Sequence, residues 1–311
     1  MDTTGLSDPQ RRAHEAVRTI QGAICRGLEA IEAASGSAAR FREDTWERPG
    51  GGGGWTRVLQ GGRVLEKGGV NVSVVHGKLG DDLGAQLPGR GEHFFATGVS
   101  LVLHPVNPHA PTVHANYRYL ERGDQRWFGG GADLTPHYYY EEDATHFHQV
   151  HRNACEAHAD VADYAYFRDW CDHYFYIRHR KEHRGVGGIF FDYQYVTDDD
   201  AFDRWLAFVI DAGAAFREAY EPILTRRKDL PYGDRERTWQ LQRRGRYAEF
   251  NLVYDRGTVF GLKTQGRIES ILMSLPPVCR WDYDVRPEPG SPEAKLLEVL
   301  TRPVPAGPFP G

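Results

Sequence analysis

The sequence predicts a single α+β domain in which helices cover both faces of a large, mostly antiparallel β-sheet. Extended segments follow one another along the chain and are joined by short turns, which favours antiparallel pairing. Helical segments lie before, between and after these strands, rather than in strict alternation with them, which argues against a doubly wound parallel sheet. The 311 residues show no internal repeat. We therefore expect residues 1–311 to form one domain.

The composition excludes several classes of protein. With 40% hydrophobic and 26% charged residues, the chain has enough apolar side chains for a core and too few in succession for a membrane span. A formal net charge of −5 argues against a nucleic-acid binder with a broad cationic surface. The four cysteines form no Cys-x-x-Cys pair, which disfavours zinc ribbons and iron–sulfur clusters. Because the first twenty residues lack a cationic segment followed by an apolar run, we expect a cytoplasmic location.

The elements in the first quarter of the chain are expected to be one helix and several strands. Ala, Ile and Leu recur at helical spacing between Asp8 and Ala39, which predicts an amphipathic helix within the first forty residues. The glycine run Pro49–Gly54 predicts a flexible loop, since a phosphate-binding loop would need a Gly-Lys-Ser/Thr ending. Short strands are expected at Arg57–Leu59, Arg63–Glu66 and Val70–His76.

Two long strands are expected in the middle of the sequence, at His93–His104 and Thr112–Glu121, because the prolines between them lock a turn. A shorter strand is expected at Trp127–Asp133. The remaining expectations are a long helix at Asp143–Arg184, a strand at Gly187–Tyr193, a helix at Asp200–Tyr220, a hairpin that pairs Tyr247–Tyr254 with Thr258–Thr264, and a loose tail at 287–311.

One strand has the polar side chains of a functional site. Side chains alternate along a strand, so His114, Asn116 and Arg118 should project from the same face. This face would offer a proton carrier, an amide and a guanidinium that can clamp a carboxylate, a combination that is untypical of a core. The partner strand should place Ser100 and His104 on the same face, so the strand pair can bring two imidazoles close together.

Glycines beside charged residues indicate further contacts to a ligand. Gly129–Gly131 would let a ligand approach the backbone and would deliver the carboxylate of Asp133 beside it, although Asp133 could instead cap a helix. Three separated arginines next to glycine or histidine, Arg118, Arg184 and Arg267, imply a ligand with more than one carboxylate. The sequence contains no dinucleotide fingerprint, P-loop, Gly-x-Ser-x-Gly elbow or His-Glu-x-x-His helix.

At these same residues the chain resembles the aerobic, oxygen-dependent coproporphyrinogen III oxidase family. The resemblance covers most of the sequence between Trp46 and Tyr283 in long, ordered blocks. These blocks are Gly69–Leu79, Phe95–Glu121, Trp127–Pro136, Glu141–His148, Tyr174–Asp192 and Tyr247–Trp281. Gln265 differs from the glycine that is more usual in the family.

The resemblance implies a homodimer of flat antiparallel sheets sandwiched by helices, with residues 247–282 at the dimer interface and a tetrapyrrole in a cleft over the sheet. It makes His114 the proton donor, Asp133 a contact to the pyrrole nitrogens and Arg184 a contact to a propionate. It also implies two larger sets of residues. Substrate would be bound by Ser100, Asn116, Tyr117, Arg118, Gln265, Gly266 and Arg267, and a metal by His104, His114, His148 and His179.

The activity that the resemblance implies is the oxygen-dependent oxidative decarboxylation of two propionates of coproporphyrinogen III. The products would be protoporphyrinogen IX, carbon dioxide and hydrogen peroxide, in haem biosynthesis. We expect no organic cofactor, molecular oxygen as co-substrate, and a possible divalent metal such as manganese. Two alternatives remain open at this point: a metal-dependent oxygenase or hydrolase that uses the same histidines, and a tetrapyrrole carrier without catalytic activity.

Overall fold

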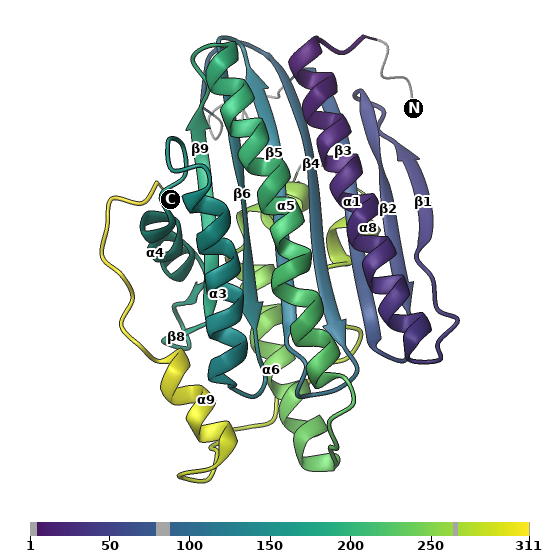
Figure 1. Ribbon diagram of the computed structural model, residues 1–311, viewed down its shortest axis with the longest axis vertical. Helices are drawn as coiled ribbons and strands as arrows, with labels where there is room; N and C mark the ends of the chain where they lie inside the picture. Colours follow the sequence, from purple (N-terminus) through teal and green to yellow (C-terminus); the bar gives the residue numbers. More distant parts are fainter. Residues whose placement is uncertain (1–4, 79–87, 264–266, 311) are drawn as a thin grey trace.

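The centre of the structure is a seven-stranded antiparallel sheet with the strand order β1-β2-β3-β4-β5-β6-β9 (Figure 1). The computed structural model describes residues 5–78, 88–263 and 267–310. The strands of this sheet are β1 (Arg42–Glu47), β2 (Gly52–Gln60), β3 (Leu65–Lys78), β4 (His93–Pro105), β5 (Thr112–Arg122), β6 (Gln125–Thr135) and β9 (Gly187–Tyr195). Two short strands, β7 (Tyr176–Ile177) and β8 (Glu182–His183), pair separately.

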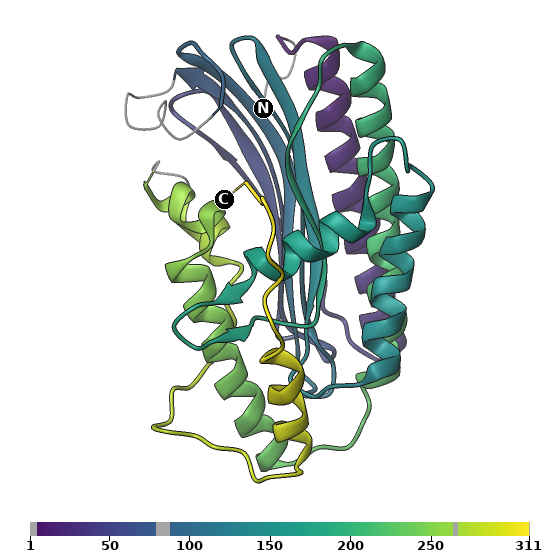
Figure 2. The ribbon, with the colours of Figure 1, turned by 90° about the vertical axis from the view of Figure 1, so that its left-hand side faces the viewer.

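Helices cover both faces of the sheet, which confirms the predicted fold class (Figure 2). One face, here called the α1 face, is covered by α1 (Asp8–Ala34), α3 (Glu141–Glu156) and α5 (Asp199–Arg227). On the opposite α6 face lie α6 (Asp234–Val253), α7 (Arg256–Lys263) and α8 (Ile268–Leu272). The remaining helices are α4 (Tyr164–Tyr174) and α9 (Pro292–Leu300). No helix in the described ranges combines the length and the apolarity that a membrane crossing requires.

The two faces of the sheet differ in how completely they are covered. Along β4 and β5 the side chains alternate between buried and partly exposed. Val99, Leu101 and Tyr117 point into the core of the α1 face, and the Tyr117 hydroxyl donates to the Ala212 carbonyl of α5 at 2.8 Å. The alternate residues, among them Ser100 and Asn116, remain partly exposed on the α6 face. This half-open face is where polar side chains can meet a ligand.

The prediction of one long helix at Asp143–Arg184 is wrong. Two helices, α3 and α4, occupy the first part of this range, and the β7 and β8 strands occupy the end. The apolar stripe that suggested one helix is real, since Phe167 and Trp170 are buried. However, the carboxylate of Asp163 accepts from the Tyr166 amide and starts a new helix there. A helix N-cap just before the apolar stripe therefore divides the segment.

The hairpin expected at Tyr247–Thr264 is also wrong, because α6 continues to Val253 and α7 follows it. Tyr247, Phe250 and Asn251 are all buried, which is the 3- and 4-residue spacing of a helix face. Aromatic and β-branched residues in this stretch favoured a strand locally, and packing against the sheet outweighed that preference.

Two segments expected to be irregular are ordered. Gly52–Gly54, the end of the glycine run, belongs to β2 and pairs with β3, and Gly54 leaves room for the Trp46 ring. The tail expected to be loose contains α9, whose Leu296 and Leu300 are fully buried. Beyond it, the Phe309 ring stacks on Trp170. The C-terminal part of the chain thus packs against the body of the domain.

Candidate active site

Adjacent positions on β4, β5 and β6 place the predicted site residues together on the α6 face. In the sheet register Ser100 lies opposite Asn116, and His114 lies opposite Asp133. Arg118 lies opposite Gly129, and Asn116 lies opposite Gly131. A Cβ atom at Gly129 would lie 2.9 Å from Arg118 Nε, so this glycine makes room for the guanidinium. The predicted one-sided arrangement of His114, Asn116 and Arg118 is thus confirmed.

A buried ion pair joins the sheet to the segment that follows β8. Arg184 Nη2 donates to Asp133 Oδ1 at 2.7 Å and to Oδ2 at 2.9 Å, and Arg184 Nε donates to Oδ2 at 3.2 Å. Both side chains are almost fully buried, at 2% and 1% exposure. Burial alone would raise the pKa of Asp133, but the Arg184 guanidinium and the His114 hydrogen bond together lower it. Asp133 is therefore an ionised carboxylate at neutral pH.

Asp133 also fixes the orientation of the His114 ring. The two side chains are joined by a 2.8 Å hydrogen bond between His114 Nδ1 and Asp133 Oδ1. Since an ionised carboxylate can only accept, the ring carries its proton on Nδ1 and directs Nε2 away from Asp133. Nε2 lies 3.3 Å from the Asn116 side-chain amide nitrogen. The Asn116 Oδ1 atom is buried and has no hydrogen-bond partner.

The surroundings of Arg184 hold it in the protein interior. Its Nη1 donates to Asn251 Oδ1 of α6 at 2.9 Å, and the guanidinium carbon lies 3.9 Å from the Phe175 ring centroid and 4.8 Å from those of Tyr247 and Phe250. The resemblance placed this arginine at a substrate propionate. In this structure its donors face Asp133 and Asn251 instead, so that role remains a prediction.

A second charged group, which sequence analysis missed, lies next to Arg118. Asp192 of β9 accepts from Arg118 at 2.7 Å and from Arg256 of α7 at 3.4 Å. The two arginines are about one-third exposed, whereas Asp192 is 6% exposed. Since one carboxylate balances only one of the two guanidinium groups, this group has a net positive charge at its exposed side. Arg256 was hidden because its segment was predicted to be the turn of a hairpin.

Several predicted binding residues lie elsewhere. The side chain of Tyr117 points to the α1 face, because it alternates with its neighbours on β5, so its expected contact with substrate is wrong for the side chain. Arg267 pairs with Asp44 of β1, four strands from β5 in the sheet order, or about 19 Å at a strand spacing of about 4.8 Å. Gln265 and Gly266 lie outside the described residues.

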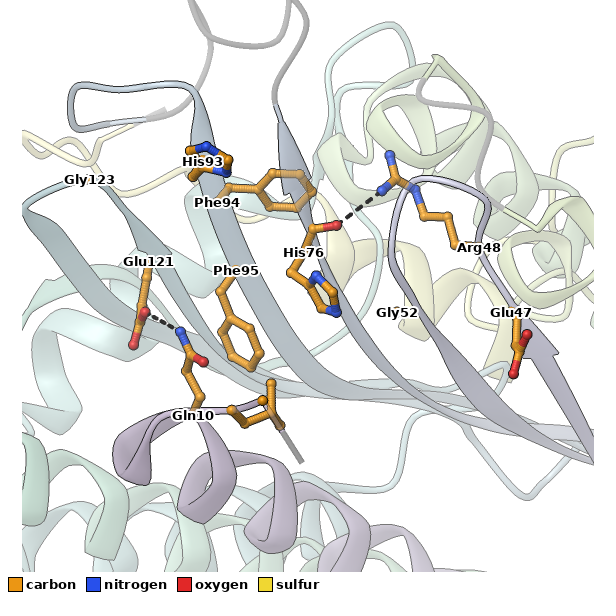
Figure 3. Close-up of a pocket in the computed structure, with 12 residues that line it drawn as sticks. Gln10, Glu47, Arg48, Gly52, His76, His93, Phe94, Phe95, Glu121 and Gly123 are labelled. Atoms are coloured by element: carbon orange, nitrogen blue, oxygen red, sulfur yellow. Dashed lines mark hydrogen bonds between the residues drawn. The ribbon is translucent and has the colours of Figure 1, made fainter. Parts of the chain in front are cut away.

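The candidate site is separate from a cavity of about 700 Å³ at the end of the sheet near the start of α1 (Figure 3). The residues that line this cavity include Gln10, His76, Phe95 and Glu121. Phe95 and Glu121 face each other on β4 and β5, and Gln10 of α1 donates to Glu121 at 2.6 Å. The cavity therefore belongs mainly to the α1 face, whereas the site lies on the α6 face.

The four histidines expected to bind a metal are each held by the protein. In every ring one nitrogen faces an oxygen acceptor, and the other faces a hydroxyl or amide donor. The acceptors are Ser274 O for His104, Asp133 for His114, Val186 O for His148 and Glu249 for His179. The donors, in the same order, are the Thr112 hydroxyl, the Asn116 amide, the Tyr164 hydroxyl and the Tyr254 hydroxyl.

This pattern does not fit a shared metal ion. A neutral imidazole has one lone pair with which to bind a metal, and the lone pairs of His104, His148 and His179 already accept a hydrogen bond from a hydroxyl. Burial also lowers the pKa of His104 and of His148, which keeps these two rings neutral. Within residues 5–78, 88–263 and 267–310, no group of three or more His, Cys, Asp or Glu side chains could hold a metal. The four histidines therefore lie apart, as hydrogen-bonded links between segments.

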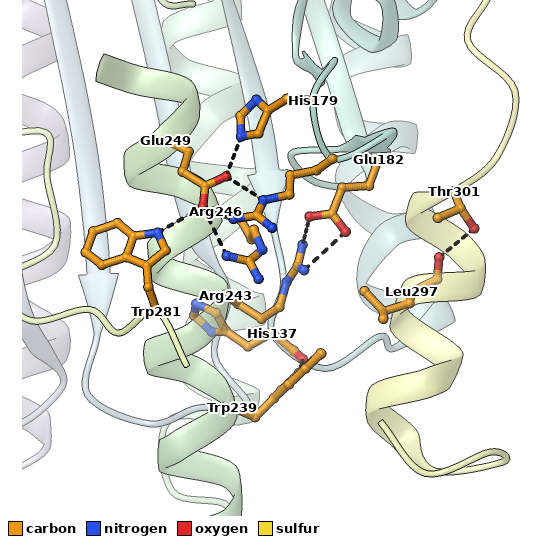
Figure 4. A network of polar contacts seen from close by, with 11 residues as sticks. His137, His179, Glu182, Trp239, Arg243, Arg246, Glu249, Trp281, Leu297 and Thr301 are labelled. Carbon is orange, nitrogen blue, oxygen red and sulfur yellow. Dashed lines mark hydrogen bonds and ion pairs between the residues drawn. The ribbon is translucent and has the colours of Figure 1, made fainter. Parts of the chain in front are cut away.

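A cluster around Glu249 connects α6 to the β7–β8 hairpin (Figure 4). Glu249 accepts from His179 at 2.7 Å and from Arg180 at 2.7 and 2.8 Å, and it also accepts from Arg246 and Trp281. Burial raises the pKa of Glu249, but these hydrogen bonds and the nearby Arg246 charge outweigh it and lower the pKa to about 2. The cluster holds the helix that carries Asn251, the partner of Arg184.

Comparisons with known proteins agree with the family resemblance. The family model described as Coproporphyrinogen III oxidase matches residues 12–305. The chain is 48% identical to the oxygen-dependent coproporphyrinogen-III oxidase of Prochlorococcus marinus (strain NATL1A), over 96% of this chain and 91% of that protein. It is 49% identical to the protein of the same name from Synechococcus sp. (strain CC9605), over 96% of this chain and 87% of that protein.

Glu249→Gln should make the stability of the protein less sensitive to acid. A carboxylate whose pKa is lowered on folding stabilises the protein above its unfolded pKa, here about 4.5. This stabilisation is lost as the pH falls from there towards about 2. In urea unfolding between pH 6 and pH 3, the wild type should therefore lose more stability than Glu249→Gln. Glu218→Gln, on the exposed side of α5, is the control, and equal pH dependence in wild type and Glu249→Gln would contradict the cluster.

Proposed function

The chain belongs to the coproporphyrinogen III oxidase family, and from this premise we propose how its site acts on two propionates of coproporphyrinogen III. The chain is an oxidoreductase of porphyrin biosynthesis, and its reaction is oxygen-dependent oxidative decarboxylation to protoporphyrinogen IX. Molecular oxygen is the co-substrate. The observation that carries the proposal is the placement of His114, Asn116 and Arg118 beside Asp133 on one open face of the sheet.

Each propionate requires one decarboxylation and one oxidation. The electron pair of the bond to the carboxylate becomes the second bond of the vinyl group as carbon dioxide leaves. The bond from hydrogen to the carbon next to the ring supplies two electrons and a proton to O₂. One further proton completes hydrogen peroxide. The protein therefore has to bind two carboxylates, orient the ring and manage protons, while an electron-rich pyrrole can pass the electrons of the C–H bond on to O₂.

Arg118 and Arg256 are the groups that best fit a propionate. Guanidinium groups bind carboxylates with two parallel hydrogen bonds, and these two arginines share the single carboxylate of Asp192. The uncompensated positive charge at their exposed side suits a substrate carboxylate. Gly129 makes this arrangement possible, since a Cβ atom there would lie 2.6 Å from Asp192 Oδ1.

His114 is the group that handles protons, and Asp133 positions it. The Asp133 hydrogen bond on Nδ1 directs Nε2 to the open face, where it can exchange a proton with substrate. Asp133 is already occupied by Arg184 and His114, so we assign it to orientation and charge rather than to a direct pyrrole contact. The unpaired Oδ1 of Asn116 is a better acceptor for a pyrrole N–H.

No step of this mechanism uses a metal, because the imidazole rings of His104, His114, His148 and His179 are not arranged to bind a metal ion together. This also weighs against a metal-dependent oxygenase or hydrolase that uses the same histidines. A tetrapyrrole carrier would bind the substrate without consuming oxygen, and it would leave the orientation of His114 by Asp133 without a purpose. A cytoplasmic location remains a prediction from the sequence.

We also propose that the chain forms a homodimer through the segment between α6 and α9. Eight of the eleven exposed large apolar side chains among the described residues lie between Leu252 and Val285. They are Leu252, Val253, Leu262, Ile268, Val278, Trp281, Tyr283 and Val285. Exposed apolar side chains concentrated in one stretch of a chain favour a protein interface there, and a second copy of the chain is the partner that the family resemblance implies.

Replacing Asp133 should remove activity towards coproporphyrinogen III in air. Asp133→Asn leaves Arg184 buried without its counter-ion and His114 without its carboxylate, and kcat for vinyl product and carbon dioxide should fall at least about 100-fold. An unpaired buried charge can cost about 3–5 kcal/mol of stability, so a variant of the less buried His114 is tested in parallel. The kcat of His114→Gln should fall about 100- to 10,000-fold.

The control for these variants is Asp211→Asn, which breaks another Asp–His pair, with His158 at 2.7 Å, away from the site. It should keep wild-type activity. Full activity in folded Asp133→Asn and His114→Gln proteins would refute the site, and substrate binding without oxygen uptake in the wild type would favour the carrier.

Val253→Arg should convert a dimer into a monomer. Val253 is 58% exposed at the end of α6, where a cation is compatible with the helix dipole, so the fold should tolerate the change while an apolar contact is lost. Sedimentation velocity at micromolar concentration should show a wild-type dimer and a smaller variant. Ile210→Arg on α5, 43% exposed, is the control, and a monomeric wild type would overturn the proposed interface.

A further inference from the structure

The C-terminal part of the chain forms hydrogen bonds with the segment that carries Arg184. This segment, residues 182–186 and here called the Arg184 segment, consists of β8 and the three residues that connect it to β9. The chain that leaves α9 passes beside it (Figures 1 and 2). His183, 1% exposed, lies between two carbonyl groups: its Nδ1 is 3.1 Å from Asp172 O, and its Nε2 is 3.2 Å from Arg302 O.

The side chain of Arg302 makes the second set of contacts. Its Nη2 donates to Asp172 Oδ1 of α4 at 2.5 Å. Its Nη1 lies 3.5 Å from the Gly185 carbonyl and 3.3 Å from the Val299 carbonyl of α9. One guanidinium thus joins α4, α9 and the residue directly after Arg184. The planar fork of arginine is suited to such simultaneous contacts, which a single ammonium group could not make in the same way.

The sequence leaves room for this contact. Gly187 has φ +91, a conformation that favours glycine. A Cβ atom at this position would lie 2.6 Å from Asp172 Oδ1 and 3.6 Å from Arg302 Nη2. A side chain at residue 187 would therefore collide with the carboxylate that Arg302 binds, so the start of β9 is compatible with the pair only as glycine.

The rest of the Arg184 segment is fixed by the backbone and by His148. The Arg184 amide donates to the Phe175 carbonyl at 2.9 Å, and the Val186 amide donates to the Leu134 carbonyl at 2.9 Å. The Val186 carbonyl accepts from His148 Nε2 at 3.0 Å. Gly185 lies between these fixed points, and Arg302 is the side chain that reaches its carbonyl.

We propose that Arg302 is a positioning residue for the active site, acting through Gly185 and Arg184 on Asp133 and His114. This proposal rests on the proposed function for its activity readout. Each link in the series is a covalent neighbour or a hydrogen bond already described. When the Arg302 side chain is removed, the Gly185 carbonyl loses its contact with the guanidinium that also binds α4 and α9, next to the point where the buried Arg184 must be held. Misplacement by about 1 Å can cost about 100-fold in rate.

The test compares Arg302→Ala with Arg302→Lys and with Arg235→Ala. Arg302 is 28% exposed, so its truncation leaves no large internal cavity. Lysine keeps the charge for Asp172 but cannot also reach Gly185 with a fork. Arg235 pairs with Glu293 at 2.6 Å and also ties α9 to α6, but it does not contact the Arg184 segment. It is therefore a control for loosened docking of α9.

We expect kcat to fall about 10- to 100-fold in Arg302→Ala, with KM within about threefold of wild type, because substrate carboxylates are bound by other arginines. The kcat of Arg302→Lys should lie between those of Arg302→Ala and wild type, and the kcat of Arg235→Ala should match wild type. A loss of stability alone would leave kcat per folded molecule unchanged.

A second readout does not depend on activity. Amide hydrogen exchange in peptides that cover residues 182–190 should be faster in Arg302→Ala than in wild type and Arg235→Ala. Unchanged exchange and unchanged kcat in folded Arg302→Ala would overturn the proposal, as would an equal loss of activity in Arg235→Ala. Faster exchange in a chain whose wild type shows no oxidase activity would support the positioning role while refuting the proposed function.

Discussion

The site depends on one buried ion pair, between Arg184 and Asp133. Removing two charges from water costs several kcal/mol per ion in proteins, so the pair is favourable only when its geometry and hydrogen bonds are nearly complete. Here three contacts join the guanidinium to the carboxylate, Asn251 takes a further donor, and aromatic rings enclose the cation. Asp133 stays ionised as a result, and an ionised Asp133 fixes the proton on Nδ1 of His114.

The sequence predicted the part of the site that depends on local periodicity. Alternation along β5 is a property of the strand itself, so the common face of His114, Asn116 and Arg118 could be predicted, and the same rule turns Tyr117 to the α1 face. The helices α6 and α7 were mistaken for a hairpin because aromatic residues around Tyr247 prefer strands when considered locally. Their helical state depends on packing against the sheet.

The contacts that complete the site join distant parts of the sequence. Arg256, at the start of α7, approaches Arg118 because both arginines bind Asp192 of β9, and the chain around Arg302 returns to the Arg184 segment after more than a hundred residues. Such pairs leave no periodic signal in one sequence. For the same reason Arg267, which seemed equivalent to the other arginines, lies at the β1 edge with Asp44.

The orientation of the His114 ring tests this account most directly. Imidazole ¹⁵N chemical shifts, assigned by comparison with His114→Gln, report which ring nitrogen carries the proton. At a pH where the ring is neutral, the account predicts a protonated Nδ1 and an unprotonated Nε2, and a change in this pattern in Asp133→Asn. A proton on Nε2, or rapid averaging between the two tautomers in the wild type, would contradict the claim that the buried Arg184–Asp133 pair sets up the site.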